Sequence, residues 1–500
     1  MIYDITVEPW IPVRMLDGSR KKVGLLDLFK DAHNIKQLDG LNVMEEYSVY
    51  RFLTLFLMAV YLPGSIDDVF GIFNIGRIDM SKVDEYLSVC RSEGVSFDIF
   101  DVKRPFLQSP YDARYDKDSD IKSIANLDCT MPSGNNHIHF NHVLEDDAVM
   151  PVDKAVRCLL AVQIFCTAAS QGYPSNVNGA PPYFFIPKGR NLFETLVFSL
   201  QPVSKKLISE KLDMELWRNS HVVVPKKTIV KVSVFYGMLF PSRRIRLIDE
   251  GSSLLRKCYF QPGLNFVGYD SWSDFYVAYY YVDKKGRFSL KPSVSKELWR
   301  NLGTIYSMVY SQVANFKVLS VVNQYKYIME QLDRSDMPML SFGVATNNAS
   351  YLDQQRGELI LNVNIANSIE KVNAVNEAIG NTEHVAVFLK KALDFLIKDL
   401  GGRKDFHMND ILQSVHEYYG KCELQFYDFC DSLATMSTEQ ERVACLEKWN
   451  VFIRDSAIKI YDLFTVVICN RSKELKAAMV SKKYLFSKLY PKDKGKEKKK

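Results

Sequence analysis

Residues 385–402 read VAVFLKKALDFLIKDLGG, and this stretch decides the architecture of the C-terminal part of the chain. Its apolar side chains recur at spacings that place them on one face of a helix: Val385, Phe388, Leu389, Ala392, Leu393 and Leu396. The pair Gly401-Gly402 then ends the helix, since glycine is the common residue just beyond a helix C-terminus. The stretch therefore predicts an amphipathic helix that packs against neighbours.

The same helical spacing continues towards the C-terminus. One set of apolar residues runs from Ile411 to Phe429, a second from Trp449 to Phe464, and a shorter segment covers Lys473 to Leu489. With a further segment near 366–379, this makes four or five helices joined by short polar turns. We therefore expect a four-helix bundle of up-and-down type over residues 366–490.

The first 365 residues mix two periodicities. Strand-like alternation occurs in 2–7, 229–234 and 275–282, whereas 45–62 and 152–169 have the composition of apolar helices. Unusual polar side chains gather at 109–150, 171–191 and 341–351, which we interpret as long functional loops. The prediction is an α+β protein: a large mixed recognition domain at 1–365, the helical bundle at 366–490, and a basic disordered tail at 491–500.

Composition limits the function. The chain has 500 residues, 47% of them hydrophobic, and a net charge of +5. The tail from Pro491 to Lys500 contains six lysines against two acids, so the rest of the chain is close to neutral. A nucleic-acid site must therefore be local and cannot rest on overall charge.

The cysteines and the N-terminus indicate a reducing compartment. Nine cysteines are scattered without a C-x-x-C pair, which argues against a structural zinc site or a disulfide framework. The segment after Met1 lacks the basic and apolar regions of a signal peptide, and charges interrupt the apolar stretch at 451–469. We expect a soluble cytoplasmic protein without a membrane partner.

Three histidines form the pattern H-x-H-x-x-H at His137, His139 and His142, followed by acidic residues at 145–147. Imidazoles and carboxylates are metal ligands, so the cluster permits a metal-dependent nuclease. It lacks the helical spacing of a zincin, however, and the chain contains no phosphate-binding glycine motif and no nucleophile elbow. We expect no metal, no cofactor and no catalytic residues, and keep the nuclease as an alternative.

Several segments have the composition of recognition loops. Arg104 to Ser109 reads RPFLQS, and 131–137, 171–182 and 342–350 combine Gly, Pro and Asn. Such residues favour turns, and amide side chains hydrogen-bond base edges or phosphates. Ordinary polar loops explain the same residues, and capping of the next element explains Asn347 and Asn348. In 242–247, Arg244 and Arg246 share one face of a possible strand; a solvated face is the favoured interpretation, and phosphate recognition the alternative.

Taken in order, six segments resemble the CasA family, the large subunit of the type I-E CRISPR surveillance complex called Cascade. Any one segment is weak evidence, whereas six in order are fairly specific. They are Trp10 to Val13, Arg104 to Gln108, Pro132 to Asn136, Gly189 to Leu196, Ser242 to Leu247 and Asn347 to Ser350.

The resemblance implies a non-catalytic subunit that reads the protospacer-adjacent motif on double-stranded DNA, largely from the minor groove, where the hydrogen-bonding pattern is degenerate. It further implies that the subunit starts duplex opening, so that guide RNA held by other Cascade subunits pairs with the target strand. Docking of the helicase-nuclease that degrades the target is the third implied role.

The resemblance also assigns residues. The family's wedge falls on Thr346, Asn347 and Asn348, where Asn348 stands in place of the usual, longer glutamine. The glycine-rich minor-groove loop falls on Gly172 to Gly179, with Ser175, Asn176 and Asn178. The first loop, which engages nucleic acid or the complex, falls on 126–142 and includes Asn135, Asn136 and His137.

Two departures accompany the resemblance. The minor-groove lysine of some members is expected at 259–264, where this chain has none, and Arg256 and Lys257 are the nearby cations. The paired cysteines of some members are reduced to Cys258, so no zinc is carried over. Besides the DNA-recognition subunit and the nuclease, a purely structural scaffold remains the third hypothesis.

Overall fold

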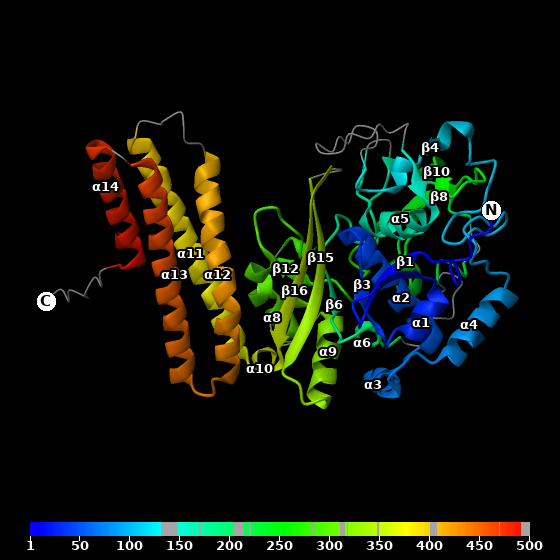
Figure 1. The fold of residues 1–500 in the computed structure, drawn as a ribbon, viewed down its shortest axis with the longest axis horizontal. Coiled ribbons are helices and arrows are strands. Elements are labelled where there is room, and N and C mark those ends of the chain that lie inside the picture. The colour runs from blue at the N-terminus through cyan, green and yellow to red at the C-terminus, as the bar shows by residue number, and fades with distance from the viewer. Residues whose placement is uncertain are drawn as a thin grey trace. The chain divides into compact units, whose positions relative to one another are not determined.

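The computed structural model describes residues 1–131, 148–169, 172–203, 215–219, 222–282, 284–310, 316–317, 319–347, 350–400, 408–469 and 471–491. The chain divides into two compact units, residues 1–298 with 311–361 and residues 299–310 with 362–500. The first unit mixes helices and strands and the second is helical, which confirms the α+β class (Figure 1). The short segment 299–310, which the sequence analysis placed in the first domain, packs in the helical unit.

Eight α-helices and two 3-10 turns lie in the described part of the first unit. The helices are α1 (Leu25–Asp31), α2 (Val43–Tyr61), α3 (Ile66–Ile75), α4 (Met80–Ser92), α5 (Val152–Phe165), α6 (Leu192–Ser199), α7 (Val234–Met238) and α9 (Ser320–Gln331), and the turns are η1 (Asp118–Asp120) and η2 (Ile124–Leu127). The helices predicted at 45–62 and 152–169 are confirmed as α2 and α5. The Asn42 side chain caps α2 by accepting from the Glu45 amide.

The strands of the first unit form several small sheets. Their orders are β2 (Arg20–Val23)-β1 (Ile11–Met15)-β3 (Ile35–Leu38); β4 (Ile121–Ser123)-β10 (Lys257–Pro262)-β8 (Arg243–Leu247); β11 (Asn265–Phe266)-β7 (Thr228–Ile229); β13 (Gly286–Ser289)-β12 (Tyr279–Val282)-β14 (Phe316–Lys317); β16 (Ser350–Asn362)-β15 (Asp336–Asn347)-β6 (Phe184–Pro187); and β5 (Met150–Pro151)-β9 (Leu254–Leu255). Strand β15 pairs with β6 antiparallel, with Phe342 opposite Phe184.

Three strand predictions are wrong or too long, each because a local side-chain bond competes with pairing. At 2–7 the Asp4 carboxylate accepts from the Thr6 amide at 2.8 Å and turns the chain, leaving only an isolated bridge to Asp98. At 229–234 the Ser233 hydroxyl caps helix α7, so strand β7 ends at Ile229. In 275–282 only β12 is a strand.

The segment 341–351, interpreted as a loop, is instead the end of a long hairpin. Strands β15 and β16 have 12 and 13 residues, and two residues separate them. Their lengths make them the longest strands in the described part of the chain, and the hairpin is prominent in Figure 1.

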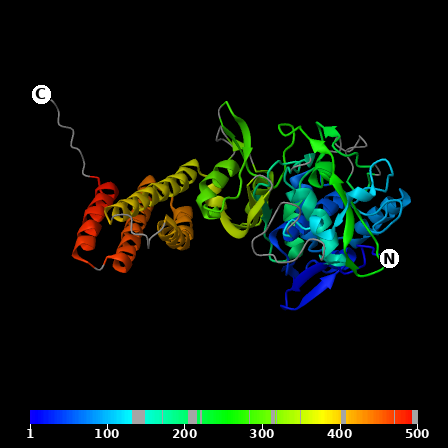
Figure 2. The same ribbon diagram turned by 90° about the horizontal axis from the view of Figure 1, so that it is seen from above.

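The second unit contains a four-helix bundle. Its helices are α8 (Leu302–Val309), α10 (Val363–Ala366), α11 (Ile369–Asp399), α12 (Met408–Thr435), α13 (Glu439–Ile468) and α14 (Ser472–Leu489), preceded by the 3-10 turn η6 (Leu298–Asn301). Helices α11 to α14 lie side by side (Figure 2). The segments near 366–379 and 385–400 are one helix, because burial of its apolar face outweighs the cost of about 1 kcal/mol for Gly380 in a helix interior.

Candidate nucleic-acid interface

The wedge hairpin, defined as β15 and β16, presents two of the predicted wedge residues at its end. The side chains of β15 are buried from Met339 to Ala345, Thr346 is half-buried and Asn347 is exposed. Asn348 lies outside the described residues. Since β15 is paired on both sides, by β6 and β16, its last residues are held on a stiff support.

The glycine loop, residues 172–179, is held open by two left-handed glycines. Gly172 and Gly179 have φ of 78° and 76°, a region that glycine occupies without steric cost. The Asn176 amide donates to the Cys166 and Gly179 carbonyls at 2.9 and 2.7 Å, and the Asn176 side chain accepts from the Asn178 backbone amide at 2.8 Å. Because Asn176 is only 1% exposed, it shapes the loop rather than contacting a ligand.

A buried network fixes Asn178 at the end of this loop. The Asn178 amide donates to Asp274 at 3.2 Å, and the Trp272 indole donates to Asn178 at 2.9 Å. Asp274 in turn forms a buried ion pair of 2.7 Å with Arg51 of α2. Burial alone would lower the pKa of Arg51, but Asp274 overrides this effect and the pKa is raised. The loop is thus tied through charged groups to the central helix of the unit.

The three predicted loops leave the fold from one place, the C-terminal end of α5. The Cys166 carbonyl accepts from the Asn176 backbone amide at 3.1 Å, and the neighbouring Phe165 carbonyl accepts from the Tyr351 hydroxyl of the wedge hairpin at 3.0 Å. The first loop begins beside them, because the Cys129 thiol contacts Tyr351. Burial raises the pKa of this thiol to about 12, so it is neutral at physiological pH.

The strand predicted at 242–247 is confirmed as β8, but its arginines are not a solvated face. Arg244 is buried against Asp116 at 2.5 Å. Arg246 stacks over the Tyr111 ring at 5.4 Å. Arg243, on the other face, donates to the Pro174 and Thr167 carbonyls at 2.6 and 2.8 Å and so clamps the glycine loop.

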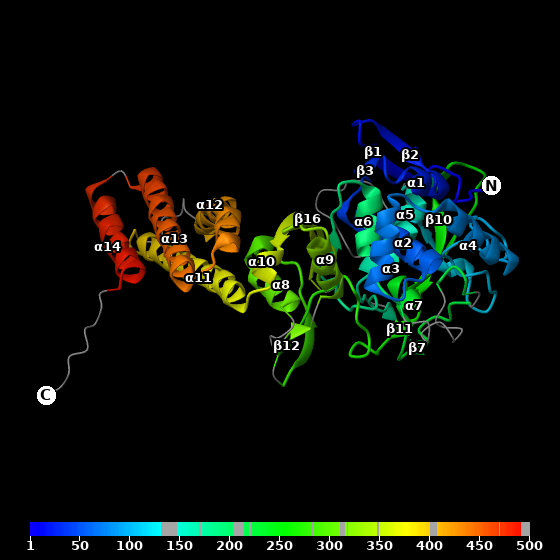
Figure 3. The same cartoon turned by 90° about the horizontal axis from the view of Figure 1, so that it is seen from below.

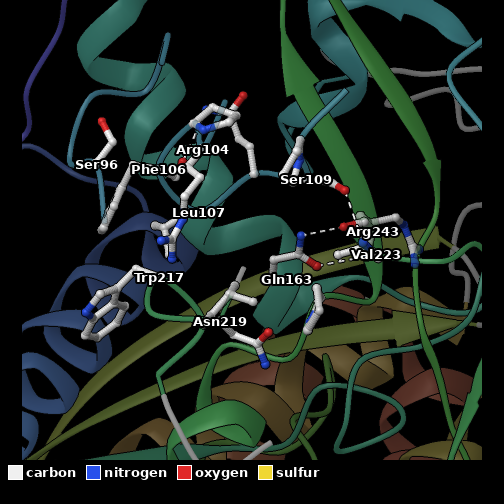
Figure 4. A pocket seen from close by; sticks show the side chains of 15 residues that line it. Ser96, Arg104, Phe106, Leu107, Ser109, Gln163, Trp217, Asn219, Val223 and Arg243 are labelled. Carbon is white, nitrogen blue, oxygen red and sulfur yellow. Dashed lines mark hydrogen bonds between the residues drawn. The ribbon is translucent and has the colours of Figure 1, made fainter. Parts of the chain in front are cut away.

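The segment from Arg104 to Ser109 lines a small internal cavity and presents no recognition surface. Figure 4 shows Phe106, Leu107 and Ser109 around it, together with Gln163 and Arg243. Both polar ends of the Gln163 side chain bond to the Arg243 backbone, at 2.8 and 2.9 Å. The unusual composition of this segment is therefore explained by packing and internal hydrogen bonds.

The other candidate contacts fall into two groups. Arg256 and Lys257 are exposed at the beginning of β10, and the Ser175 hydroxyl lies 3.0 Å from that of Tyr269. Asn135, Asn136 and His137, as well as His139 and His142, lie outside the described residues.

A lysine that the sequence analysis missed adjoins the glycine loop. Lys226 is exposed and in a left-handed conformation, with φ of 61°. Its amide donates to the Gly263 carbonyl at 2.7 Å, and its Nζ is 2.7 Å from the position a Cβ on Gly172 would take. Lys226 thus brings a cation beside the segment 259–264, where a lysine was expected and the sequence has none. Only the three-dimensional fold reveals this, because the two segments are distant in sequence.

Within the part of the chain that the structure describes, no group of three or more His, Cys, Asp and Glu side chains is arranged to hold a metal ion. No single helix there is long and apolar enough to cross a membrane; α2 and α3 pass that test only as a pair bent by 100°.

Comparison with known proteins identifies relatives along nearly the whole chain. The sequence model of the family described as CRISPR-associated protein Cse1 matches residues 4–460. CRISPR-associated protein CasA/Cse1 of Thermus thermophilus is 22% identical over 501 residues, which cover 95% of each chain.

Solved structures agree with the fold. A structure of Thermus thermophilus CasA (Cse1) has a TM-score of 0.77 at 19% identity and covers 97% of this chain and 99% of its own. Cse1 of Acidimicrobium ferrooxidans has a TM-score of 0.77 at 17% identity, with 98% of each chain covered. A chain of a structure described as a CRISPR RNA-guided surveillance complex has a TM-score of 0.75 at 17% identity, covering 97% of this chain and 100% of its own.

Proposed function

This chain belongs to the CRISPR-associated Cse1 family, and from that premise we propose that it is the large subunit of an RNA-guided type I-E Cascade complex. In this proposal it is a cytoplasmic, non-catalytic subunit that recognises the protospacer-adjacent motif on double-stranded DNA. It then starts strand separation, and guide RNA held by the other subunits pairs with the target strand.

The observation that carries the proposal is the common origin of the three loops. The first loop, the glycine loop and the wedge hairpin all meet at Phe165 and Cys166, so one short duplex segment can contact all three. Loops held by a rigid scaffold in this way are typical of binding sites.

The two described elements suit different steps. The glycine loop offers close backbone approach at Gly172 and Gly179, with the Lys226 cation beside it, as reading of a narrow groove requires. The wedge hairpin offers an exposed Asn347 on a stiff support, which suits insertion beneath a base pair at a cost of a few kcal/mol of unstacking. Thr346, Asn347 and Asn348 are therefore assigned to opening, and Gly172, Ser175 and Gly179 to reading.

The remaining assignments follow the family. Arg256 and Lys257, with Asn135, Asn136 and His137, are proposed to contact nucleic acid or the neighbouring subunits. A helicase-nuclease recruited to the complex supplies cleavage, so this chain itself needs no catalytic residues.

The test is binding of the reconstituted complex to duplexes that carry a matched target beside a randomised flank. We expect the wild type to select a short flanking motif, while Gly179→Asp and Asn348→Ala lose that selection but keep guide pairing to single-stranded target. Absence of a flank preference in the wild type would instead favour a scaffold. Metal-dependent cleavage by the isolated chain that requires His137, His139 and His142 would favour the nuclease.

A further inference from the structure

The hairpin of β12 and β13, which we call the aromatic hairpin, has a composition that the proposed function does not use. Residues 279–291 read YYYVDKKGRFSLK, with three consecutive tyrosines, one phenylalanine and four cations against a single acid. In the structure Tyr280 lies opposite Phe288 and Tyr281 opposite Arg287. Figure 3 shows β12 projecting from the body of the first unit.

Both faces of this hairpin expose aromatic rings. Tyr281 is 46% and Phe288 37% exposed. On one face Tyr280 and Phe288 stack with ring centroids 5.9 Å apart, and on the other the Arg287 guanidinium lies 4.4 Å from the Tyr279 ring centroid. A single exposed aromatic residue is ordinary, but a cluster of them on a projecting element indicates a binding surface.

The charge of the hairpin specifies the kind of ligand. Lys284 and Lys285 are exposed at the turn, and Lys291 is exposed beyond the end of β13. Aromatic rings interleaved with lysines match a chain that carries phosphates and planar bases. In a duplex the base faces are covered by neighbouring pairs, so exposed rings gain more from unpaired bases.

A groove connects the hairpin to the glycine loop. It has a volume of about 250 Å³ and is lined by Asn178 and Gly179 on one side and by Arg287, Phe288 and Lys291 on the other, with Tyr269 at its wall. The segment after β13 is anchored on the sheet of the wedge hairpin, because the Leu290 carbonyl accepts from the Tyr183 amide at 2.8 Å and the Ser293 carbonyl accepts from Gln355 at 2.9 Å. The groove therefore opens beside the proposed site of strand separation.

We propose that the aromatic hairpin and this groove bind single-stranded nucleic acid. Bases stack on Tyr281 and Phe288, and phosphates pair with Lys284, Lys285 and Lys291. The inference rests on the proposed function to the extent that opening of a duplex at the wedge hairpin supplies the unpaired strand.

The test measures binding of a fluorescent 20-nucleotide oligothymidylate to the full chain by anisotropy. We expect the double variant Tyr281→Ala/Phe288→Ala to raise the Kd about tenfold, the change that loss of a base-stacking platform produces. Lys284→Glu/Lys285→Glu should also weaken binding and reduce the slope of log K against log salt by about 1.4, from two phosphate contacts of about 0.7 each. Circular dichroism and thermal melting establish that the variants are folded.

The matched control is Phe486→Ala/Tyr490→Ala at the end of α14, where the side chains are 41% and 44% exposed beside lysines. It should leave the Kd unchanged. Equal binding by wild type and the Tyr281/Phe288 variant, or an equal loss in the control, would overturn the inference.

The outcome is separable from that of the proposed function. Asn347→Ala is expected to keep oligothymidylate affinity and to impair opening of a matched duplex, whereas the Tyr281/Phe288 variant keeps flank selection. If the Tyr281/Phe288 variant instead fails to enter the reconstituted complex while binding oligothymidylate normally, the hairpin is a subunit contact and the inference is wrong.

Discussion

The glycine loop and the wedge hairpin begin at the same place but are held by different forces. Side-chain hydrogen bonds and a buried ion pair fix the loop, through Asn176, Asn178 and Asp274. Main-chain pairing with β6 and β16 holds the wedge hairpin, and Asn347 at its end is exposed. The comparison teaches that changes beneath the loop alter both stability and reading, whereas a change at the hairpin end alters function alone.

The largest effect is expected from Arg51→Ala, which tests whether the loop depends on its buried ion pair. The change leaves the Asp274 carboxylate buried without its partner, and breaking such a pair costs about 3–5 kcal/mol. We expect a large fall in the urea midpoint of the first unit, followed by tryptophan fluorescence, together with loss of flank selection.

A midpoint within error of wild type for Arg51→Ala would show that the loop is held by other contacts. Arg114→Ala, at an exposed ion pair with Asp112, is the control and should change stability little.

The hairpin is tested next by Gly343→Ala on β15. A Cβ there would lie 2.5 Å from the Tyr183 ring and 2.6 Å from Pro292, and overpacking of this kind costs about 1–3 kcal/mol. We expect a lower melting temperature by calorimetry. Gly420→Ala on α12 is the control with the opposite sign: it meets open space and should stabilise the helical unit by up to about 1 kcal/mol.

A smaller effect is expected from Gly179→Ala in the glycine loop. Tyr269 is the nearest atom to the new Cβ, at 3.9 Å, so only the left-handed backbone resists, at about 1–2 kcal/mol. Flank selection should weaken although the chain remains folded. Selection equal to that of the wild type would exclude close approach of a ligand at this glycine.

The smallest effect concerns Cys258 on β10, the strand whose Phe260 carbonyl accepts from Tyr173 of the glycine loop. Burial raises the pKa of Cys258 to about 12, and only the thiolate reacts with iodoacetamide. A raised pKa keeps the thiol protonated at pH 7 to 9, so we expect no alkylation of the native chain over that range. Peptide mass spectrometry should find rapid labelling in urea; labelling of the native chain would show that this support opens.

The sequence predicted the helices better than the strands. The apolar periodicity of 385–396 and of 411–429 identified the bundle because a long amphipathic helix repeats its signal over many turns. Short strands such as β7 have two residues and no such repetition, and at 229–234 the Ser233 cap outweighed strand propensity.

The candidate site was only partly visible in the sequence. Glycine and asparagine composition identified the loop and the end of the wedge hairpin, but nothing local distinguishes Asn176, which is buried, from an amide that faces a ligand. The support from Arg51, Asp274 and Arg243 depends on contacts between segments up to 223 residues apart. For the aromatic hairpin a signal was present, in the three tyrosines at 279–281 followed by Lys284 and Lys285.

The central claim is that the loop reads and the hairpin opens, and the most direct test separates binding from opening. A matched duplex carries 2-aminopurine next to the selected flank, and its fluorescence reports unstacking in the reconstituted complex at saturating protein. We expect Asn347→Ala to bind the flank with wild-type affinity but to open the duplex more slowly, and Asn178→Ala to bind more weakly but, once bound, to open it at the wild-type rate. Equal losses of affinity and opening rate in both variants would contradict this division of roles.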